Sequence, residues 1–500
     1  MTKIAKKLII VLTSKQVMPA KISISEFKQY NKKDVPKLRY AMLHARFGLP
    51  DGVSIVMKQI ESVMTNEMKI PKENIFYLVG KSGKKSPNIQ ANSLFLDGFN
   101  GNRLATKKFK EGFGGSISER IENELREAVQ VIEDFVEKNK IDVILAHNTC
   151  HPVNFILSVA LSRFYRNRLK RKQKTPKYLL WWHDSHMERE HFANPPRDIE
   201  RYLLQGIPGP YPEYIFFINS GQFRIAEKYF LQLGKMKKGF FESISKNNDV
   251  IYNTTDTFIE SFNDLKKDKD GFVKFLRDFS LEEYLVERNT TLKDTLFCLQ
   301  HTRIVKRKRI DFALEYCFEL LEETNKRKKK KKSLFFFISG NDDKDGSKQQ
   351  LRRKYLALKK KFPDQQVFLE FAEDYYNKTD IKFEEYPRIF AKLGGFSTYF
   401  SEIEGFGNNL LEVLASGLIP VVYTYPVFCS DIEKYNFKLI ALDKFEIQQD
   451  KIKETIDILK NNRKRKIWVN MNLDILRENF AHQIIDFKLT RGIIRRRTHR

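Results

Sequence analysis

Residues 400–422 read FSEIEGFGNNLLEVLASGLIPVV and carry the strongest structural signal in the chain. The pattern predicts a strand that ends at about Phe400, a glycine-containing turn, and a helix over residues 409–417. Pro420 then leads into a new strand. This order of strand, turn and helix is typical of α/β folds, in which ligands bind at the carboxyl ends of the strands.

The same stretch has the chemistry of a site for anions and polyols. The start of a helix offers unpaired N–H groups and the positive end of the helix dipole, which suit a diphosphate. Gly405 and Gly407 let a ligand approach the backbone closely. Glu404 on the turn and Glu412 in the helix are placed to accept hydrogen bonds from hydroxyl groups. The alternative is a strand, turn and helix with two surface glutamates and no function.

Apolar runs alternate with amphipathic helical patterns through the first half of the chain, which predicts a parallel, doubly wound sheet. The clearest helix is expected over Ser118–Lys138, where apolar residues recur at steps of three and four. The expected strands are Lys7–Leu12, Ile75–Val79, Val143–Ala146, Tyr178–Trp182, Tyr214–Ile218 and Val250–Tyr252.

The alternation pauses over Asp256–Asn289, which is rich in Lys, Asp and Glu, and then restarts. We therefore expect a second α/β domain and place the boundary near residue 280, with a cleft between the two domains. A last helical segment at about Val469–Arg491 is expected to pack back on the first domain. The strands expected in the second domain are Thr295–Leu299, Leu334–Ser339, Val367–Glu370, Gly395–Phe400, Ile419–Tyr423 and Leu439–Ala441.

The bulk composition excludes a disordered chain and favours acidic partners. With 500 residues, the chain is too long for one core, and 41% hydrophobic residues suffice for two. Lys and Arg number 90 against 63 Asp and Glu, a formal net charge of +27. Such a balance suits phosphate-bearing substrates, an anionic membrane or nucleic acid, and does not choose among them. A lysine-rich proteome would explain the excess equally well.

The four cysteines lie far apart in the sequence, so they form neither a CxxC pair nor a zinc set, as expected for a reducing, cytoplasmic compartment. The apolar run Leu8–Leu12 is shorter than a signal-peptide core, and no run is long enough to span a membrane. Basic runs at Lys326–Lys332, Arg166–Lys174 and Arg495–Arg497 read best as solvated loops. Peripheral contact with the inner face of an anionic membrane is the alternative.

The stretch from Glu404 to Glu412 resembles the Glu-x7-Glu signature of glycosyltransferase group 1, the retaining GT-B superfamily. The resemblance implies two Rossmann-like domains facing a central cleft. It also implies that Glu404 contacts the transferred sugar and that Glu412 contacts the ribose of a nucleotide. Backbone amides around Phe406, Gly407 and Asn408 would hold the sugar and the phosphates.

A second match is TRIVKRKRID at residues 302–311, which follows the expected strand Thr295–Leu299. It resembles the family's Gly-Arg…Lys-Gly loop and implies that Arg303 and Lys308 bind the donor diphosphate. Arg suits bidentate contact with phosphate, and Lys supplies a point charge. Cations at this position stabilise the negative charge that grows as the diphosphate leaves.

The second match departs from the family pattern at two positions. Thr302 and Arg309 stand where the family has glycine, and Lys306 is an alternative to Lys308 as the diphosphate ligand. Nearby, Asp343-Lys344-Asp345 imitates the metal-binding Asp-x-Asp of the other glycosyltransferase fold, GT-A. We interpret it as a surface loop, because Arg303 and Lys308 with a helix end would neutralise the diphosphate without a metal.

The first domain offers weaker matches. The loop Gly48–Ser54 resembles the family's glycine-rich loop near the donor phosphates, which implies a donor-binding role for Gly52. About thirty residues would separate this loop from the expected first strand. His183 and Asp184 follow another strand, where family members often place a His-Asp pair close to the reacting sugar. His183 would bond the sugar or the acceptor, or would be a structural histidine. His147 is a weaker candidate for the acceptor pocket.

The resemblance implies transfer of a hexose from a nucleoside-diphosphate sugar to an acceptor hydroxyl, with retention, without a metal and without another cofactor. Residues 1–280 would bind the acceptor, 281–475 the donor, and 476–500 would form a helix and basic tail. The alternatives are a GT-B sugar phosphorylase or synthase, and a non-catalytic polyanion-binding protein on this scaffold. Nucleic acid is not expected as a partner. The sequence leaves open the sugar, the acceptor and the base, whose contacts are expected near Glu370–Ala372.

Overall fold

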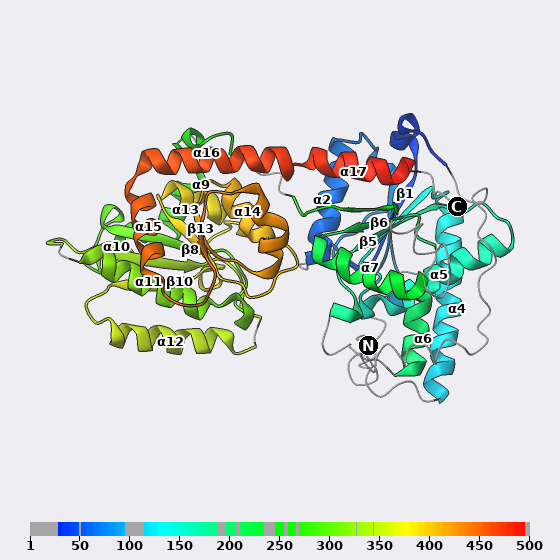
Figure 1. The fold of residues 1–500 in the computed structure, drawn as a ribbon, viewed down its shortest axis with the longest axis horizontal. Coiled ribbons are helices and arrows are strands. Elements are labelled where there is room, and N and C mark those ends of the chain that lie inside the picture. Colours follow the sequence, from blue (N-terminus) through cyan, green and yellow to red (C-terminus); the bar gives the residue numbers. More distant parts are fainter. Residues whose placement is uncertain are drawn as a thin grey trace. The chain divides into compact units, whose positions relative to one another are not determined.

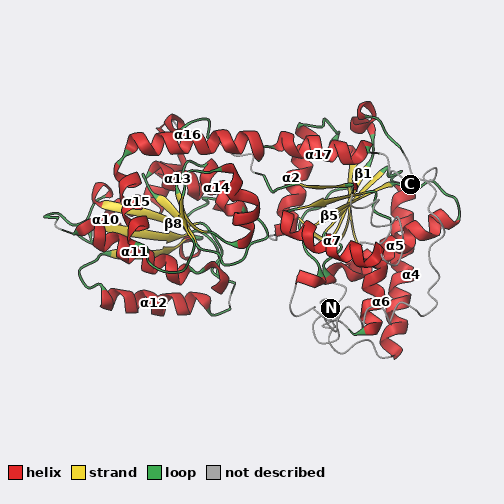
Figure 2. Cartoon of the chain, viewed as in Figure 1, coloured by secondary structure: helices red, strands yellow, loops and turns green. Residues whose placement is uncertain are grey.

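A computed structural model describes residues 29–49, 52–95, 115–188, 196–206, 211–234, 246–254, 259–266, 270–326, 328–343 and 345–495. The chain forms two compact units, Met1–Tyr252 with His482–Arg500, and Asn253–Ala481. In each unit, strands form the centre and helices lie outside them (Figure 2). No helix in the described ranges combines the length and the apolar character needed to cross a bilayer.

The division after Tyr252 differs from the boundary expected near residue 280. The charged segment in between forms α9 (Asp270–Asp278) and α10 (Leu281–Val286), whose apolar side chains join the core of the second unit. Phe275 lies edge-on to Phe337 and Phe390 of that core. The frequent Lys, Asp and Glu residues of this segment conceal an apolar face that binds it to the second unit.

The first unit is a seven-stranded sheet in the order β3-β2-β1-β4-β5-β6-β7, with all registered pairs parallel. Helices cover both of its faces (Figure 1). Its strands are β1 (Tyr40–Phe47), β2 (Ile75–Ser82), β3 (Ile89–Ala91), β4 (Val143–His147), β5 (Lys177–Trp182), β6 (Tyr214–Phe217) and β7 (Asn248–Val250). Its helices are α2 (Gly52–Asn66), α4 (Gly115–Lys138), α5 (Phe155–Lys170), α6 (Arg197–Gly206), α7 (Ser220–Gly234) and α17 (His482–Ile494).

Side-chain alternation along the strands builds two cores in the first unit, one on each face of the sheet. On β1, Ala41 and Leu43 face the core shared with α4 and α5, while Tyr40 and Met42 face the core shared with α2 and α17. The C-terminal helix α17 packs against α2 and the adjoining strands, so this unit is completed by the end of the chain.

The strand before the glycine loop differs from expectation. The expected first strand, Lys7–Leu12, lies outside the described residues, and β1 ends directly before Gly48. The strand that directly precedes the glycine loop is therefore β1, with no insertion between them. His44 and Arg46 interrupt the apolar run of β1 and hid the strand. His44 is nevertheless buried, and its Nδ1 atom lies 3.0 Å from the backbone oxygen of His147.

The second unit is a six-stranded parallel sheet in the order β10-β9-β8-β11-β12-β13. Its strands are β8 (Thr295–Gln300), β9 (Ser333–Ile338), β10 (Val367–Phe371), β11 (Phe396–Tyr399), β12 (Pro420–Tyr423) and β13 (Ile440–Leu442). Beside α9 and α10, its helices are α11 (Ile310–Asn325), α12 (Ser347–Lys361), α13 (Tyr386–Lys392), α14 (Asn408–Ala415), α15 (Gln449–Lys460) and α16 (Asn462–Asn479).

The two sheets share one topology. Counting from its first strand, each follows the order 3-2-1-4-5-6, and the first adds β7 at the edge. In such a sheet successive strands are first added on one side of the first strand, and from the fourth strand on they are added on its other side. The strand order therefore reverses between β1 and β4 in one unit and between β8 and β11 in the other. Loops that leave these strands diverge and leave room for a ligand. The predicted α/β, doubly wound architecture is confirmed in both units.

Candidate functional site

Two loops meet at the point in the second sheet where the strand order reverses. One follows β8 and contains residues 301–309, and the other follows β11 and contains residues 400–407. The backbone N–H of Glu402 donates to the backbone oxygen of Arg307 at 2.9 Å, which ties the loops together. The two segments singled out from the sequence are thus neighbours in the fold.

Glu404 and Lys308 form an ion pair at the junction of these loops. The Lys308 ammonium donates to Glu404 Oε1, and Arg307 Nη1 lies 3.2 Å from Glu404 Oε2. The side chains of Lys308 and Glu404 are 5% and 10% exposed, so both charges are largely removed from water. Arg307 is more exposed and extends the cluster toward solvent.

The cluster sets the charge state of Glu404. Burial alone would raise the pKa of this carboxyl group, but the positive charges of Lys308 and Arg307 outweigh burial and lower it. Glu404 is therefore a carboxylate at neutral pH. Burial also lowers the pKa of the Lys308 ammonium, an effect that Glu404 opposes. The Lys308 ammonium also lies over the ring of Tyr399, with Nζ 5.5 Å from the ring centre.

The turn after Glu404 requires glycine. Gly407 has φ of +125°, and an added Cβ would collide with the Tyr425 hydroxyl. That hydroxyl donates to the backbone oxygen of Phe406 at 2.7 Å and fixes the turn from below. Helix α14 begins at the next residue, Asn408, whose side-chain oxygen accepts a 2.6 Å hydrogen bond from Asn253 Nδ2. The predicted amide-rich helix start is present.

Glu412, one turn into α14, lies against a histidine that the sequence did not single out. His301 Nε2 is 3.1 Å from Glu412 Oε2, and its Nδ1 is 2.8 Å from the hydroxyl oxygen of Ser339. Asn409 Nδ2 donates to the backbone oxygen of His301 at 2.7 Å. The available signal was position, because His301 directly follows β8 and precedes the motif residues Thr302 and Arg303.

Arg303 does not join the Lys308 cluster. Its Nη1 atom lies 3.1 Å and 2.8 Å from the two carboxylate oxygens of Asp343. Asp343 belongs to the Asp-x-Asp sequence interpreted as a surface loop, and here it pairs with a cation. Across the described ranges, no group of three or more His, Cys, Asp or Glu side chains is arranged to hold a metal ion. Gly340 packs directly against the backbone of Thr302, which brings the loop after β9 close to the loop after β8.

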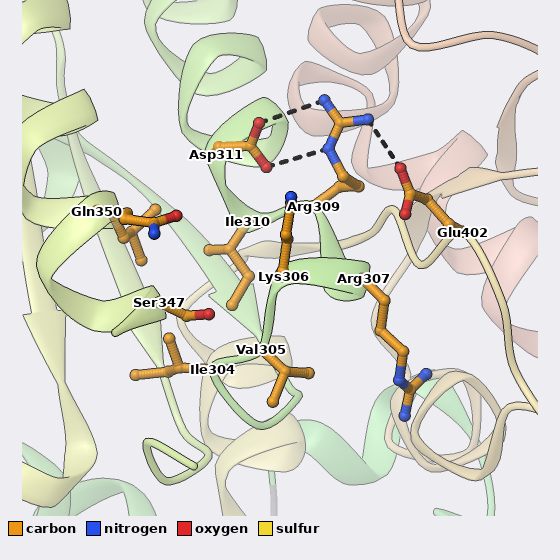
Figure 3. Close-up of a pocket in the computed structure, with 11 residues that line it drawn as sticks. Ile304, Val305, Lys306, Arg307, Arg309, Ile310, Asp311, Ser347, Gln350 and Glu402 are labelled. Carbon is orange, nitrogen blue, oxygen red and sulfur yellow. Dashed lines mark hydrogen bonds and ion pairs between the residues drawn. The ribbon is translucent and has the colours of Figure 1, made fainter. Parts of the chain in front are cut away.

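A cavity of about 550 Å³ lies beside the loop that follows β8 (Figure 3). Lys306 and Arg309 line it, but Lys308 and Glu404 do not. Arg309, where the resemblance drawn from the sequence implies glycine, has φ of +46°, the left-handed conformation that glycine adopts without strain. Asp311 and Glu402 bind its guanidinium, at 3.2 Å and 3.1 Å. The departure at this position therefore keeps the backbone shape.

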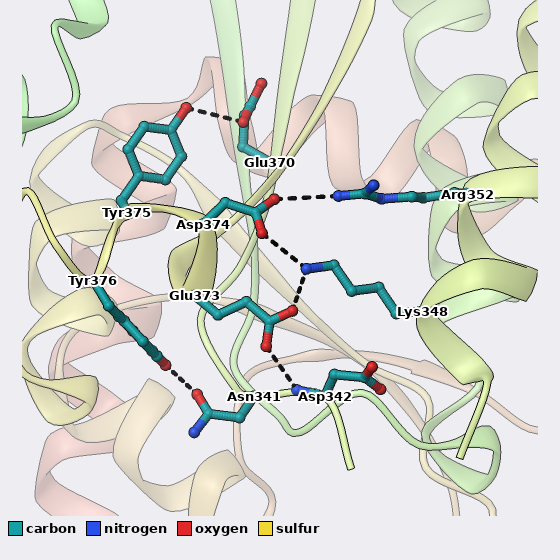
Figure 4. A network of polar contacts seen from close by, with 9 residues as sticks. All are labelled: Asn341, Asp342, Lys348, Arg352, Glu370, Glu373, Asp374, Tyr375 and Tyr376. Atoms are coloured by element: carbon teal, nitrogen blue, oxygen red, sulfur yellow. Dashed lines mark hydrogen bonds and ion pairs between the residues drawn. The ribbon is translucent and has the colours of Figure 1, made fainter. Parts of the chain in front are cut away.

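A polar network holds the segment after β10, near which the base contacts were expected (Figure 4). The carboxylate of Glu370 accepts hydrogen bonds from Tyr284 at 2.7 Å and from Tyr375 at 3.0 Å. Lys348, in the first turn of α12, pairs with Glu373 and with Asp374. Two loops at the carboxyl edge of the sheet are thus fixed relative to each other.

At the carboxyl edge of the first sheet, buried histidines take the place of the ion pair found in the second sheet. His183 follows β5 and is buried, and its backbone oxygen accepts a hydrogen bond from Gln222. His147 lies at the end of β4, with its ring centre 6.0 Å from that of His183. Both ring nitrogens of His147 lack a hydrogen-bond partner among the described residues. The backbone N–H of Asp184 donates to Asn148 Oδ1 at 3.1 Å, which ties the two loops together.

Gly52 is the first residue of α2, as the glycine-loop interpretation requires. Among the described residues, no atom lies within 4 Å of where a Cβ at Gly52 would stand. The described neighbours therefore leave room for a side chain at residue 52, in contrast to Gly407.

Residues 285–472 match the family described as glycosyl transferases group 1. The chain is also 26% identical over 419 residues to the mannosylglucosylglycerate synthase of Petrotoga mobilis, a match that spans 81% of this chain and 86% of that protein. The resemblance to group 1 glycosyltransferases, first drawn from Glu404 to Glu412, is confirmed over residues 285–472.

Solved structures agree on the fold. The α,α-trehalose-phosphate synthase (UDP-forming) of Burkholderia xenovorans, in complex with glucose-6-phosphate, superposes with a TM-score of 0.56 at 9% identity, over 91% of this chain and 100% of that chain. Anabaena Alr3699/HepE in complex with UDP gives a TM-score of 0.55 at 11% identity, over 91% and 99% of the two chains. The GT-B fold class predicted from the sequence is confirmed.

Proposed function

We propose that this chain, a glycosyltransferase of group 1, transfers a hexose from a nucleoside-diphosphate sugar to an acceptor hydroxyl with retention at the anomeric carbon. One observation carries the proposal. Lys308 and Arg307 hold the carboxylate of Glu404 at the carboxyl edge of the second sheet, directly before a glycine turn and the start of α14. Groups suited to bind an anion and a carboxylate suited to bind a polyol thus lie in one place.

In the proposed reaction each group has one task. The amides at the start of α14 and the side chains of Arg303 and Lys308 bind the diphosphate. Glu404 accepts hydrogen bonds from the hexose hydroxyls, and Glu412 accepts them from the ribose. As the bond from the anomeric carbon to the diphosphate breaks, the cations stabilise the leaving oxygen more than they stabilise the ground state.

Retention follows if the acceptor hydroxyl attacks from the face that the diphosphate leaves. The new carbon–oxygen bond then forms as the old one breaks, and the acceptor proton passes to the departing phosphate oxygen. We propose that the protein cations and the helix start replace a metal in neutralising the diphosphate. In the first unit, we propose Gly52 as a donor-binding residue and His183 as a residue that bonds the hexose or the acceptor.

The relative from Petrotoga mobilis suggests the class of acceptor. Its name specifies mannosylglucosylglycerate as its product. The match between the two proteins covers most of both chains, so we propose a small glycoside that bears a carboxylate as the acceptor. The net charge of +27 suits such an anionic substrate.

The first experiment is a donor screen by thermal shift. Sugars linked to UDP, GDP and ADP, each far above its expected dissociation constant, should raise the melting temperature only if they bind. The bound donor is then incubated with glucosylglycerate, and the product is identified by mass and by the NMR coupling of its anomeric proton. Turnover of a hexose 1-phosphate instead would favour the phosphorylase alternative.

A matched pair of variants tests the site. Glu404→Gln keeps the shape and removes the charge, and we expect turnover to fall about 100-fold or more. Glu402→Gln lies two residues away and loses only a half-exposed ion pair with Arg309, so it serves as the control. The proposal would be refuted if Glu404→Gln turned over the donor as fast as Glu402→Gln does. It would also be refuted if the unmodified chain turned over no nucleotide sugar. Activity lost in EDTA and restored by a divalent cation would contradict the metal-free step.

A further inference from the structure

His301 connects three elements at the carboxyl edge of the second sheet. It follows β8, and its ring reaches Ser339, directly after β9, and Glu412 in α14. One face of the ring stacks on Phe383, with the ring centres 4.0 Å apart and the planes 17° from parallel. The His301 side chain is 1% exposed, whereas that of Glu412 is 28% exposed. A buried ring thus holds a carboxylate that solvent can reach.

The polar contacts define which nitrogen of His301 carries hydrogen. An ionised carboxylate only accepts hydrogen bonds, so the Nε2 atom facing Glu412 must be the donor. In the neutral ring Nδ1 is then an acceptor, and the Ser339 hydroxyl donates to it at 2.8 Å. The other acceptor near that hydroxyl, the backbone oxygen of Gln300, is 3.5 Å away, at the limit of a hydrogen bond. The Ser339 hydroxyl is thus placed to favour the tautomer of His301 that donates to Glu412.

The ring has little freedom to turn away from this position. Phe383 stacks on it, and Asn409 of α14 donates to the backbone oxygen of His301, which ties the helix to the loop. A carboxylate on a helix surface ordinarily samples several rotamers, and a ligand that needs one of them binds more weakly because binding must restrict the side chain to it. The fixed Nε2–H donor of His301 holds Glu412 in one rotamer before a ligand binds, so this entropy cost no longer falls on binding.

We propose that His301, oriented by Ser339, is the positioning residue that holds the Glu412 carboxylate ready for the ribose of the donor. The proposal rests on the function proposed above, in which Glu412 accepts hydrogen bonds from the ribose. His301 itself touches no substrate in this scheme. The contribution of His301 should appear as a larger ratio between the affinity for a nucleotide with ribose hydroxyls and the affinity for the same nucleotide without them.

The test compares nucleotides rather than overall activity. Affinities of UDP, GDP and ADP are measured by calorimetry, and the tightest binder is compared with its 2′,3′-dideoxy counterpart. Loss of a hydrogen bond to a charged group should cost the unmodified chain about 10- to 100-fold in affinity for the dideoxy form. We expect His301→Ala to reduce this ratio about tenfold, and Ser339→Ala to reduce it less.

Two further variants separate positioning from folding. In His301→Gln the amide reaches the position of Nε2 and donates to Glu412, so it should restore most of the ratio, whereas the shorter His301→Asn should not. Ser333→Ala is the control for Ser339→Ala. It removes a hydroxyl from the other end of β9, where Ser333 bonds Thr290 and Thr295, and should leave the ratio unchanged.

The outcomes distinguish the inference from the function on which it rests. If Glu412→Ala keeps the full ratio, Glu412 does not bind the ribose and both proposals fail at that residue. If Glu412→Ala abolishes the ratio while His301→Ala and His301→Asn keep it, the positioning role alone is wrong. If no nucleotide binds the unmodified chain, both the function and the inference are refuted. A ratio that falls equally in Ser333→Ala and Ser339→Ala would show general loosening of β9 and contradict the specific role.

Discussion

The two sheets have the same strand order, and each buries a histidine at the point where that order reverses. In the first unit His44, within β1, contacts the backbone oxygen of His147. In the second unit His301, just after β8, contacts the side chain of Glu412. The first histidine contacts its neighbouring strand through a backbone oxygen, and the second supports a carboxylate that remains accessible. The same architecture thus carries different chemistry at equivalent places.

Charge accounts for much of the difference. Burial, with His183 and His44 nearby, lowers the pKa of His147 well below its ordinary value, so this ring is neutral at physiological pH. The second edge instead buries the charges of Lys308 and Glu404, which are tolerated because they neutralise each other. A neutral polar edge suits hydroxyl-bearing ligands, and a cationic edge suits phosphates. Of the two carboxyl edges, the one with the buried ion pair of Lys308 thus lies in the unit that matches group 1 glycosyltransferases.

The strongest test of this contrast removes the buried cation. Lys308→Met keeps the length of the side chain and leaves Glu404 buried beside Arg307 alone. We expect a loss of about 3 kcal/mol in the free energy of unfolding at pH 7, because a buried charge has lost its main partner. Turnover should fall about 100-fold or more, since one of the cations proposed to stabilise the leaving group is gone.

The dependence on pH identifies the cause of that loss. In the unmodified chain the pKa of Glu404 is lowered, so its ion pair stabilises the fold above the pKa of the unfolded chain, and this stability is lost as pH falls through the folded value. In Lys308→Met burial raises that pKa, so the carboxylate destabilises the fold at neutral pH and less so in acid. Urea unfolding from pH 7 to pH 4 should show the gap between the two proteins closing.

A double variant provides the control for Lys308→Met. Adding Glu404→Gln removes the unpaired charge and should restore most of the stability without restoring turnover. A double variant as unstable as Lys308→Met would show that packing, rather than charge, explains the defect.

The second test compares a glycine from each unit. At Gly407 the positive φ and the Tyr425 hydroxyl both oppose a side chain, so Gly407→Ala should cost about 1–3 kcal/mol and distort the start of α14. At Gly52 the described structure leaves room, so Gly52→Ala should stay within about 0.5 kcal/mol of the unmodified chain. Thermal unfolding measures both.

Activity then separates the two glycines further. If Gly52→Ala folds normally but its KM for the donor rises, a ligand approaches the backbone at residue 52. An unchanged KM would show that Gly52 takes no part in donor binding.

The sequence predicted the strands that are nearly continuous apolar runs, because such strands are buried on both faces and need no partner to be recognised. It missed β1, where His44 and Arg46 break the run, because burial of a histidine depends on neighbours that only the fold supplies. The boundary moved for a related reason. Phe275 and its neighbours are separated by charged residues along α9, and a core contact becomes visible only once the helix is placed.

The site was predicted residue by residue and not as an arrangement. Glu404 and Lys308 were each assigned a ligand, but their mutual ion pair joins positions 96 residues apart and could not be derived from spacing. Arg303 was assigned to the diphosphate, whereas here it binds Asp343, a residue dismissed as part of a surface loop. His301 was missed because one histidine after a strand has no motif of its own.

The smallest expected effect concerns the ion pair of Arg303 with Asp343. Arg303 is an exposed cation at the edge of the second sheet, whereas Lys308 is a buried one. Arg303 is 59% exposed, so its ion pair with Asp343 is weak. A phosphate can therefore displace Asp343 from Arg303, although Asp343 still competes with it. Asp343→Asn should therefore lower the KM for the nucleotide sugar by about two- to fivefold at low salt, with little change in kcat. The gain should fade as salt screens the exposed charges, unlike the loss in Lys308→Met.

Asp364→Asn is the matched control for this last change. It removes one carboxylate from another exposed ion pair of the same unit, with Lys331, which lies just before β9, at the opposite edge of the sheet from the proposed donor site. Both variants raise the net charge equally, so a lower KM in Asp343→Asn alone must come from the released guanidinium. If both variants lower KM alike, the effect is long-range attraction of an anionic donor. If Asp343→Asn raises KM, Asp343 orients Arg303 for the phosphate and does not compete with it.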